Sequence, residues 1–269
     1  MEPVVPTEKT KKAAHSFHSK VAAEFIGTAL LVFGGLSLIF AVTWPHGLIA
    51  GSLGHLPLAQ RALAGFAFGA FVGILAISPL GRMSGAHFNP SITLALWRRG
   101  GVNTPIAVCY MFAQLCGGVL GAAALSLWGD IADELHYGLT APGPDVNVWT
   151  AFIGEVVVTF LLVSVVLGQQ RWNLPTIASF LAVPILFSLM TMIEAPLSGT
   201  STNLARSIGP ALAARDVSAV WIYAIGPAIG AVLASYVIPG RTYELADPLI
   251  STGDGVSEWH PSGRPGCRR

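Results

Sequence analysis

Charged residues are scarce in this chain. Only 11% of its 269 residues are Asp, Glu, Lys or Arg, and the formal net charge is +1. Soluble domains carry about 25% charged residues, so the composition excludes an ordinary water-soluble globule. Because there is no excess of positive charge to neutralise phosphates, a nucleic-acid partner is excluded as well.

Cysteine is also rare. The three cysteines, Cys109, Cys116 and Cys267, form no even disulfide framework and lack the spacing of a metal or redox site. The sequence contains no nucleophile motif and no phosphate-binding loop. We therefore expect no metal, no cofactor and no enzymatic activity.

Long stretches without charge are abundant, and they predict membrane-spanning helices. A helix needs about 20 apolar residues to cross ~30 Å of hydrocarbon. The six predicted spans are 20–42, 61–80, 104–126, 149–169, 174–194 and 217–238. Two further apolar pieces, 88–98 and 203–213, are too short to span and are interpreted as buried or re-entrant segments. The chain is thus predicted to be an all-α membrane protein with six transmembrane helices and two re-entrant half-helices.

The distribution of Lys and Arg predicts the orientation in the bilayer. With six spans, most basic residues fall on one side, in the N-terminal arm 1–19, the tail 239–269 and two connections. The opposite side holds loop 127–148, which has four acids but no Lys or Arg. Basic loops stay in the cytoplasm, so we expect both termini there. We further expect a channel domain over 20–238 and a location in the plasma membrane.

The chain repeats itself in two halves, about 20–126 and 149–238. Each half opens with a glutamate inside a span, Glu24 or Glu155, and each contains a similar short segment. These segments are Ser84-Gly85-Ala86-His87-Phe88-Asn89-Pro90 and Ser198-Gly199-Thr200-Ser201-Thr202-Asn203-Leu204. Three spans per half make the copies run in opposite directions across the bilayer. Inverted repeats with short interrupted segments point to a permeation site near the midplane.

Two matched asparagines are the strongest candidates for that site. Asn89 precedes Pro90, which reads as an N-cap followed by proline at the first helical position, and Asn203 occupies the same place in the second copy. Both half-helices would start near the bilayer centre with positive dipole ends that repel cations and protons. Each carboxamide can cap its helix through oxygen and offer N–H donors to a passing water or hydroxyl oxygen.

These two segments give the chain its resemblance to the major intrinsic protein family, the aquaporins and aquaglyceroporins. The resemblance covers about residues 20–238 and implies six tilted helices, two half-helices and a homotetramer with one pore per subunit. The sequence departs from the family's Asn-Pro-Ala pair twice: Ser91 replaces alanine in the first box, and Leu204 replaces proline in the second. Leucine lacks the fixed φ of proline and adds an N–H.

The resemblance also implies a selectivity constriction. Its members would be Phe68 on the second span, Thr191 on the fifth, Thr200 before the second box and Arg206 after it, with Gly69 the alternative to Phe68. Arg206 would donate to passing oxygens and repel cations. Thr191 stands where water-selective relatives place histidine, which implies a wider opening.

The remaining polar residues are interpreted as structural. Glu24 and Glu155 are expected to accept hydrogen bonds from the N–H groups of the half-helix loops and so to brace the pore. His87 is expected to support its loop. Glu194 has no partner in the repeat, and we expect it in a wet vestibule or at an interface.

Three classes of function follow, and the passive pore is favoured. The first is a channel for water and small neutral solutes that excludes protons and ions. Ser207 after the arginine favours water, whereas Thr191 and the pair Tyr223-Ala224 favour an aquaglyceroporin-like facilitator of glycerol, urea, peroxide or metalloid hydroxides. An ion-coupled secondary transporter would need acids that face the lumen, and Glu24 and Glu155 look structural. A membrane enzyme would need a catalytic motif that the sequence lacks.

Overall fold

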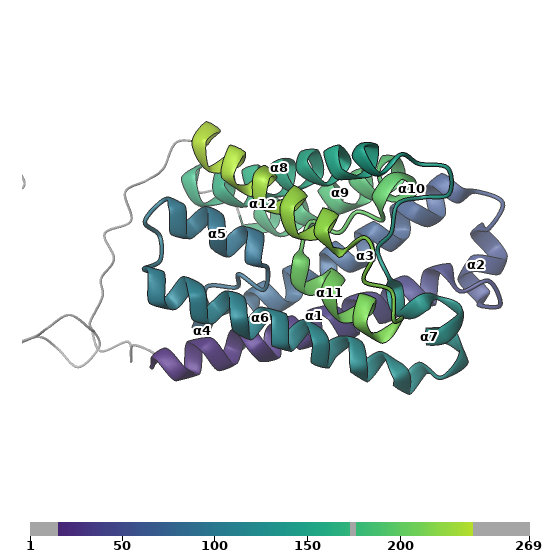
Figure 1. The fold of residues 1–269 in the computed structure, drawn as a ribbon, viewed down its shortest axis with the longest axis horizontal. Helices are drawn as coiled ribbons and strands as arrows, with labels where there is room; N and C mark the ends of the chain where they lie inside the picture. The colour runs from purple at the N-terminus through teal and green to yellow at the C-terminus, as the bar shows by residue number, and fades with distance from the viewer. Residues whose placement is uncertain (1–15, 173–175, 239–269) are drawn as a thin grey trace, which may run out of the picture. The chain divides into compact units, whose positions relative to one another are not determined.

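The computed structural model describes residues 16–172 and 176–238. Most of the predicted arm 1–19 and all of the tail 239–269 lie outside these residues. Within them the regular structure is helical, and Figure 1 shows how the helices are arranged. The long helices are α1 (Phe17–Thr43), α3 (Pro57–Ile77), α6 (Thr104–Ala124), α8 (Val148–Trp172), α9 (Thr176–Ile193) and α12 (Val220–Val237).

The two re-entrant pieces form helices too short to cross a membrane. They are α5 (Pro90–Arg98) and α11 (Leu204–Ala213). The short helices in the connections are α2 (Leu48–Leu53), α4 (Pro79–Ser84), α7 (Asp130–Glu134) and α10 (Ala195–Ser198), with 3-10 turns η2 (Leu125–Trp128) and η3 (His136–Gly138). The predicted architecture of six long helices and two half-helices is therefore confirmed.

The helix ends differ from the predicted spans for local reasons. The second span was expected at 61–80, but α3 begins at Pro57, a residue suited to the first helical turn, and ends at Ile77. Its end is fixed by Ser78, whose side chain caps α4, and by Pro79, which cannot continue α3 with a helical hydrogen bond. The shortest of the six long helices are α9 and α12, with 18 residues each. At 1.5 Å per residue, each is about 27 Å long.

The helices pack as two interlocked halves. The closest pairs are α1 with α6, α8 with α12, and α3 with α9. Each half-helix crosses to the other half: α11 packs against α6, and α5 packs against α12 (Figure 1). This exchange places the starts of α5 and α11 close together, although they are far apart in the sequence.

Glycine allows the closest of these crossings. A Cβ on Gly118 of α6 would lie 2.0 Å from the carbonyl oxygen of Ala205, and one on Gly209 of α11 would lie 2.3 Å from that of Gly118. Both contacts are to backbone, so a side chain could be accommodated only by moving a helix. The two glycines therefore set how deeply α11 sits against α6.

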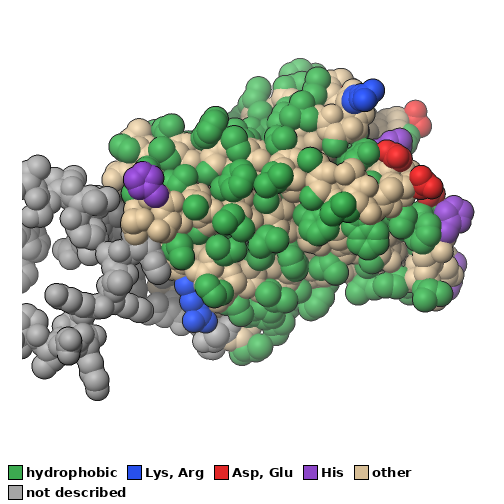
Figure 2. All heavy atoms as spheres, turned by 90° about the horizontal axis from the view of Figure 1, so that it is seen from below, with side chains coloured by type: hydrophobic (Ala, Val, Ile, Leu, Met, Phe, Trp, Pro, Cys, Tyr) green, Lys and Arg blue, Asp and Glu red, His purple; other side chains and the backbone are tan. Residues whose placement is uncertain are grey.

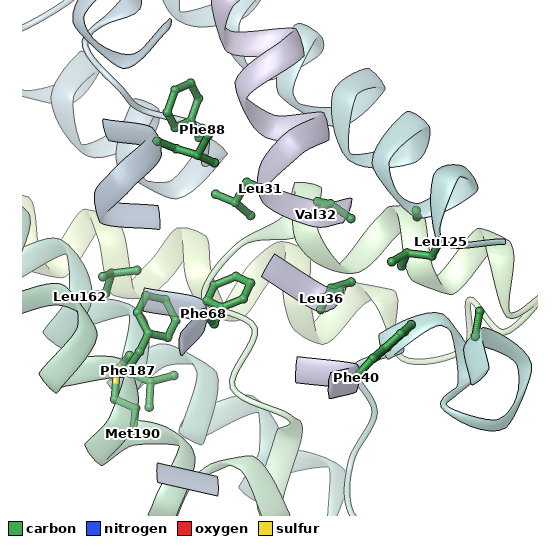
Figure 3. Packing of buried hydrophobic residues seen from close by; sticks show 14 residues of the cluster. Leu31, Val32, Leu36, Phe40, Phe68, Phe88, Leu125, Leu162, Phe187 and Met190 are labelled. Atoms are coloured by element: carbon green, nitrogen blue, oxygen red, sulfur yellow. The ribbon is translucent and has the colours of Figure 1, made fainter. Parts of the chain in front are cut away.

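The outer surface suits a lipid environment. Large apolar side chains such as Phe112 (69% exposed) and Ile153 (59%) face outward, and Figure 2 shows hydrophobic side chains covering the flank between two ends that carry charged groups and histidines. Five helices among the described residues are long and apolar enough to span a membrane, and 177–193 forms a shorter apolar helix. The buried core groups Leu31, Leu36, Phe68, Phe187 and Met190 from α1, α3 and α9 (Figure 3).

Candidate functional site

Asn89 and Asn203 cap the two half-helices in the same way. Their backbone angles agree, with φ −154° and ψ 121° for Asn89 and φ −152° and ψ 107° for Asn203. Asn89 Oδ1 accepts from the N–H of Ser91 at 2.8 Å, and Asn203 Oδ1 accepts from the N–H of Ala205 at 2.9 Å. The first residue of α5 is Pro90 and the first residue of α11 is Leu204. The asparagine cap of α11 therefore forms without a proline after it.

The two asparagines are also tied to each other's loops. Asn89 Nδ2 donates to the carbonyl oxygen of Thr202 at 3.0 Å, and Asn203 Nδ2 donates to that of Phe88, also at 3.0 Å. Each side chain is only 4% exposed. An amide nitrogen carries two hydrogens, so each asparagine retains one further donor beside the same cavity.

The two repeated glutamates hold the loops before these caps. Glu24 accepts from the N–H groups of His87 (3.1 Å) and Phe88 (2.7 Å). Glu155 accepts from the N–H groups of Ser201 (2.7 Å) and Thr202 (2.9 Å). Successive N–H groups can converge on one carboxylate because the loops take left-handed angles at matched places: Ala86 and Thr200, then Phe88 and Thr202.

Other side chains complete this bracing, and two of them, Gln114 and Tyr110, were not predicted from the sequence. His87 Nδ1 lies 3.0 Å from Thr93 Oγ1, within its own loop and half-helix. Gln114 Nε2 donates to Glu24 at 2.7 Å, and Tyr110 donates to the Ser84 carbonyl oxygen at 2.9 Å. The signal for Tyr110 was its partner in the repeat, Tyr223, which donates to the Ser198 carbonyl oxygen at 2.7 Å. Gln114 has no such signal, because the repeat places Pro227 at its position.

Two cavities adjoin these loops. The larger cavity has a volume of about 670 Å³ and is bordered by both asparagines and by mostly apolar residues of α1, α3, α8 and α9. The smaller cavity has a volume of about 150 Å³ and is bordered by Thr191, Thr200 and Arg206. Phe68 and Phe187 border both cavities. Because Phe68 and Phe187 border both cavities, the two phenyl rings lie where the cavities adjoin, and the larger cavity extends from the asparagine pair to Ile77 and Ile177.

The four residues expected at a constriction all border the smaller cavity. Phe68 lines it, whereas Gly69 faces α9, where an added Cβ would lie 2.7 Å from Pro184 Cα. Of the two alternatives left by the sequence, Phe68 is therefore the one beside the cavity. Thr191 Oγ1 lies within hydrogen-bond distance of the carbonyl oxygens of Phe187 (2.8 Å) and Arg61 (2.9 Å), so its hydroxyl is turned toward backbone.

Arg206 is the buried cation beside the smaller cavity. It lies in the first turn of α11 and is 6% exposed. Its Nη1 donates to the carbonyl oxygen of Gly138 at 2.6 Å, which ties the loop after α7 to the half-helix. A guanidinium carries five N–H donors, so this bond leaves others for oxygens in the cavity.

Phe187 is a lining residue that the sequence analysis did not single out. Its ring meets that of Phe68 edge to face, with centroids 5.2 Å apart, and the two are neighbours in Figure 3. It lies in α9, where polar residues are few and apolar residues occupy every face, so no periodic pattern shows which face turns inward. Its place one helical turn before Thr191 was the available signal.

Glu194 differs from its expected position. A wet vestibule or an interface was expected, but the side chain is only 4% exposed within a single chain, and this expectation is wrong. The chain turns at Glu194 from α9 into α10, which folds the carboxyl group back against Ser198 and Thr200.

Comparisons with known proteins show the family to which the chain is similar. The profile of the family described as Major intrinsic protein matches residues 11–238. The chain is 33% identical over 227 residues to "Probable aquaporin TIP2-2" of Oryza sativa subsp. japonica, covering 80% of this chain and 84% of that protein. It is 32% identical over 264 residues to "Aquaporin-5" of Ovis aries, covering 94% and 95%.

A solved structure supports the fold. The X-ray structure of the aquaglyceroporin from Plasmodium falciparum matches with a TM-score of 0.68 and 20% identity, covering 82% of this chain and 95% of that one. At that identity the likeness concerns the fold alone. Together with the family profile and the relatives, it shows that the chain belongs to the major intrinsic protein family.

Proposed function

We propose that the protein is a passive membrane channel for water that excludes ions and protons. The observation that carries the proposal is the pairing of Asn89 with Asn203 beside the larger cavity, with each amide bonded to the opposite loop. A water oxygen that accepts from both remaining amide hydrogens cannot accept a proton from its neighbour. The positive ends of α5 and α11 lie at the same place and repel cations.

The selectivity constriction is assigned to Phe68, Thr191, Thr200 and Arg206, together with Phe187. The Thr191 hydroxyl donates to the carbonyl oxygen of Arg61 or of Phe187. The Thr200 hydroxyl donates to the carboxyl group of Glu194. A solute in the smaller cavity would therefore meet the donors of Arg206, with Arg61 as a second arginine on the border and apolar residues such as Phe68 and Phe187 elsewhere on the wall. Such a passage selects by diameter and by its small number of hydrogen-bonding groups.

A facilitator of small neutral solutes such as glycerol or urea is the second candidate. It is favoured by the small side chain of Thr191 at the smaller cavity and by the apolar walls of the larger one. An apolar wall opposite hydrogen-bond donors suits the carbon backbone and the hydroxyls of a polyol. The aromatic pair of Phe68 and Phe187 opposes this reading because it occupies the place where the two cavities meet.

The two candidates are separated by stopped-flow light scattering of proteoliposomes that contain the full chain. Water, glycerol and urea gradients are applied in turn, and membrane voltage is monitored for ion leak. Water flux above that of empty liposomes, without glycerol flux and without leak, supports the water channel. Glycerol or urea flux supports the second candidate, and dependence of flux on an ion gradient contradicts both.

We further propose a homotetramer in the plasma membrane with both termini in the cytoplasm. The orientation is supported by Arg82, Arg98 and Arg171 on one side and by the acidic α7 on the other. In that orientation the smaller cavity faces outward. Native mass spectrometry should give four chains, and a protease added outside intact cells should spare both termini.

A further inference from the structure

Glu194 is a buried acid that the re-entrant fold itself does not need. In the first half, the residue four positions before Ser84 is Leu80, whereas Glu194 stands four positions before Ser198. The first half therefore builds the same loop without an acid at this position. The carboxyl group of Glu194 lies in a pocket of the protein against α8, where a Cβ on Gly154 would be 2.7 Å from Glu194 Oε1.

The hydrogen bonds around Ser198 fix the position of one proton. Ser198 Oγ lies 2.6 Å from Glu155 Oε1, and it also forms a short hydrogen bond with Glu194 Oε1. A serine hydroxyl has a single hydrogen, so it can donate to only one of two carboxyl groups, and the other must donate to it. Two ionised carboxylates cannot share this hydroxyl.

The proton belongs on Glu194. Both oxygens of Glu155 accept backbone N–H groups, from Ser201 and Thr202, which favours its charged form. Arg206 also lies close enough to attract the negative charge of Glu155. The chain of donors then runs from the carboxylic acid of Glu194 to Ser198 and from Ser198 to the carboxylate of Glu155.

The second oxygen of Glu194 reaches the constriction. Thr200 Oγ1 donates to Glu194 Oε2 at 2.5 Å, and Thr200 borders the smaller cavity beside Arg206. This bond turns the Thr200 hydroxyl away from the cavity and toward buried protein. Glu194 thus contacts a lining residue without lining the cavity itself.

We propose that Glu194 is a positioning residue of the constriction, protonated in the open protein, and that loss of its proton releases Thr200 and lowers water flux. The inference rests on the proposed function for the role of Thr200. Deprotonation of Glu194 places a second negative charge beside Glu155 of α8. The other ionisable groups near these two acids are Arg206 of α11, Tyr223 of α12 and Arg61 of α3, which donates to the Met192 carbonyl oxygen. Repulsion from Glu155 drives the charged carboxylate away from Ser198 and from Thr200 together, and the Thr200 hydroxyl that it leaves behind can turn into the passage.

The test measures water flux in proteoliposomes from about pH 5 to about pH 9, a range that includes the pKa values documented for buried glutamates. For the wild type we expect a reversible fall of about threefold or more as the pH rises. Glu194→Gln can donate to Ser198 and accept from Thr200 like the neutral acid, so it should keep the acid-form flux at every pH. Thr200→Val, which has no hydroxyl to release, should also be independent of pH.

Glu134→Gln, which removes an exposed acid near Trp44, is the matched control and should keep the wild-type profile. A pH-independent wild type, or a Glu194→Gln variant that keeps the wild-type profile, overturns the inference. A Thr200→Val variant that keeps the profile overturns the part played by Thr200.

Infrared difference spectra between acid and alkaline pH give a readout that does not depend on conduction. A carboxylic acid band should be present in the wild type and absent from Glu194→Gln. A preparation with this band but with no water flux at any pH overturns the proposed function and supports the protonation of Glu194. A conducting preparation without the band overturns the inference.

Discussion

The ring of Phe68 on α3 meets the ring of Phe187 on α9 edge to face, at 5.2 Å between centroids, where the two cavities join. An edge-to-face pair fixes both rings more firmly than either would be alone. The pair is thus a rigid apolar wall between the arginine and the asparagines. Its size limits what can pass from one cavity to the other.

Replacing Phe187 by alanine should widen this wall. We expect glycerol or urea flux to rise about tenfold, equivalent to ~1.4 kcal/mol in the barrier, with a smaller change in water flux. Phe112→Ala, which removes an exposed ring from α6, is the control and should leave both fluxes unchanged. Unchanged solute flux in Phe187→Ala, at equal protein levels, would mean that the pair does not limit passage.

Thr191→His should narrow the smaller cavity and add a donor. Thr191 is close to α3, where a Cβ on Gly65 would lie 2.1 Å from Thr191 Oγ1, so a larger ring must extend toward the cavity. Glycerol or urea flux should fall more than water flux, by about tenfold relative to it. If both fluxes stay the same, the assignment of Thr191 to the constriction is wrong.

Asn203→Asp should lower the barrier to cations and reduce the stability of the folded protein. A carboxylate cannot donate to the Phe88 carbonyl oxygen, and a buried group left without its hydrogen bond costs about 1–3 kcal/mol. A membrane-voltage assay should show cation leak, and the protein should unfold at a lower temperature. Asn89→Asp, which loses the bond to Thr202, should behave in the same way, so a defect confined to one of the two would contradict the paired arrangement.

Gly118→Ala should prevent α11 from seating against α6. Overpacking in a tight interior costs about 1–3 kcal/mol, and here the contact is with the Ala205 carbonyl oxygen. We expect a large loss of folded protein on size-exclusion chromatography. Gly51→Ala in α2, where an added Cβ meets nothing within 4 Å, should be neutral; equal yields from the two variants would contradict the close approach.

Mercurials should inhibit water flux only weakly. Cys109 and Cys116 are partly buried on α6 and do not border either cavity in the described part of the chain. Cys267 lies outside the described residues. Strong block that is reversed by thiols and abolished by Cys116→Ser would show that the lining has been assigned wrongly.

The sequence was sufficient for features that occur twice. Asn89 with Asn203 and Glu24 with Glu155 could be found because the repeat gives each a partner, and each pair has equivalent hydrogen bonds in the structure. Phe187 could not be found in this way, because a helix with apolar residues on every face carries little signal for the face that turns inward.

Glu194 was misplaced for a different reason. An acid at the end of an apolar run is usually in contact with water, and the sequence does not show that the chain turns back there. Ser198 lies four residues further on and could be paired with it locally. The approach of Glu155, from a helix about 40 residues away in sequence, is a product of tertiary packing alone.

The exchange of half-helices makes the two halves dependent on each other while allowing them to differ. One half alone lacks the carbonyl partner of its asparagine, so two halves must insert in opposite directions to complete the centre. Two identical halves would give identical mouths. In this chain Ile92 stands at the place that matches Arg206, and it borders the larger cavity. Joining the halves in one polypeptide therefore gives the passage a direction: a solute meets a cation first from one side and an apolar chamber first from the other.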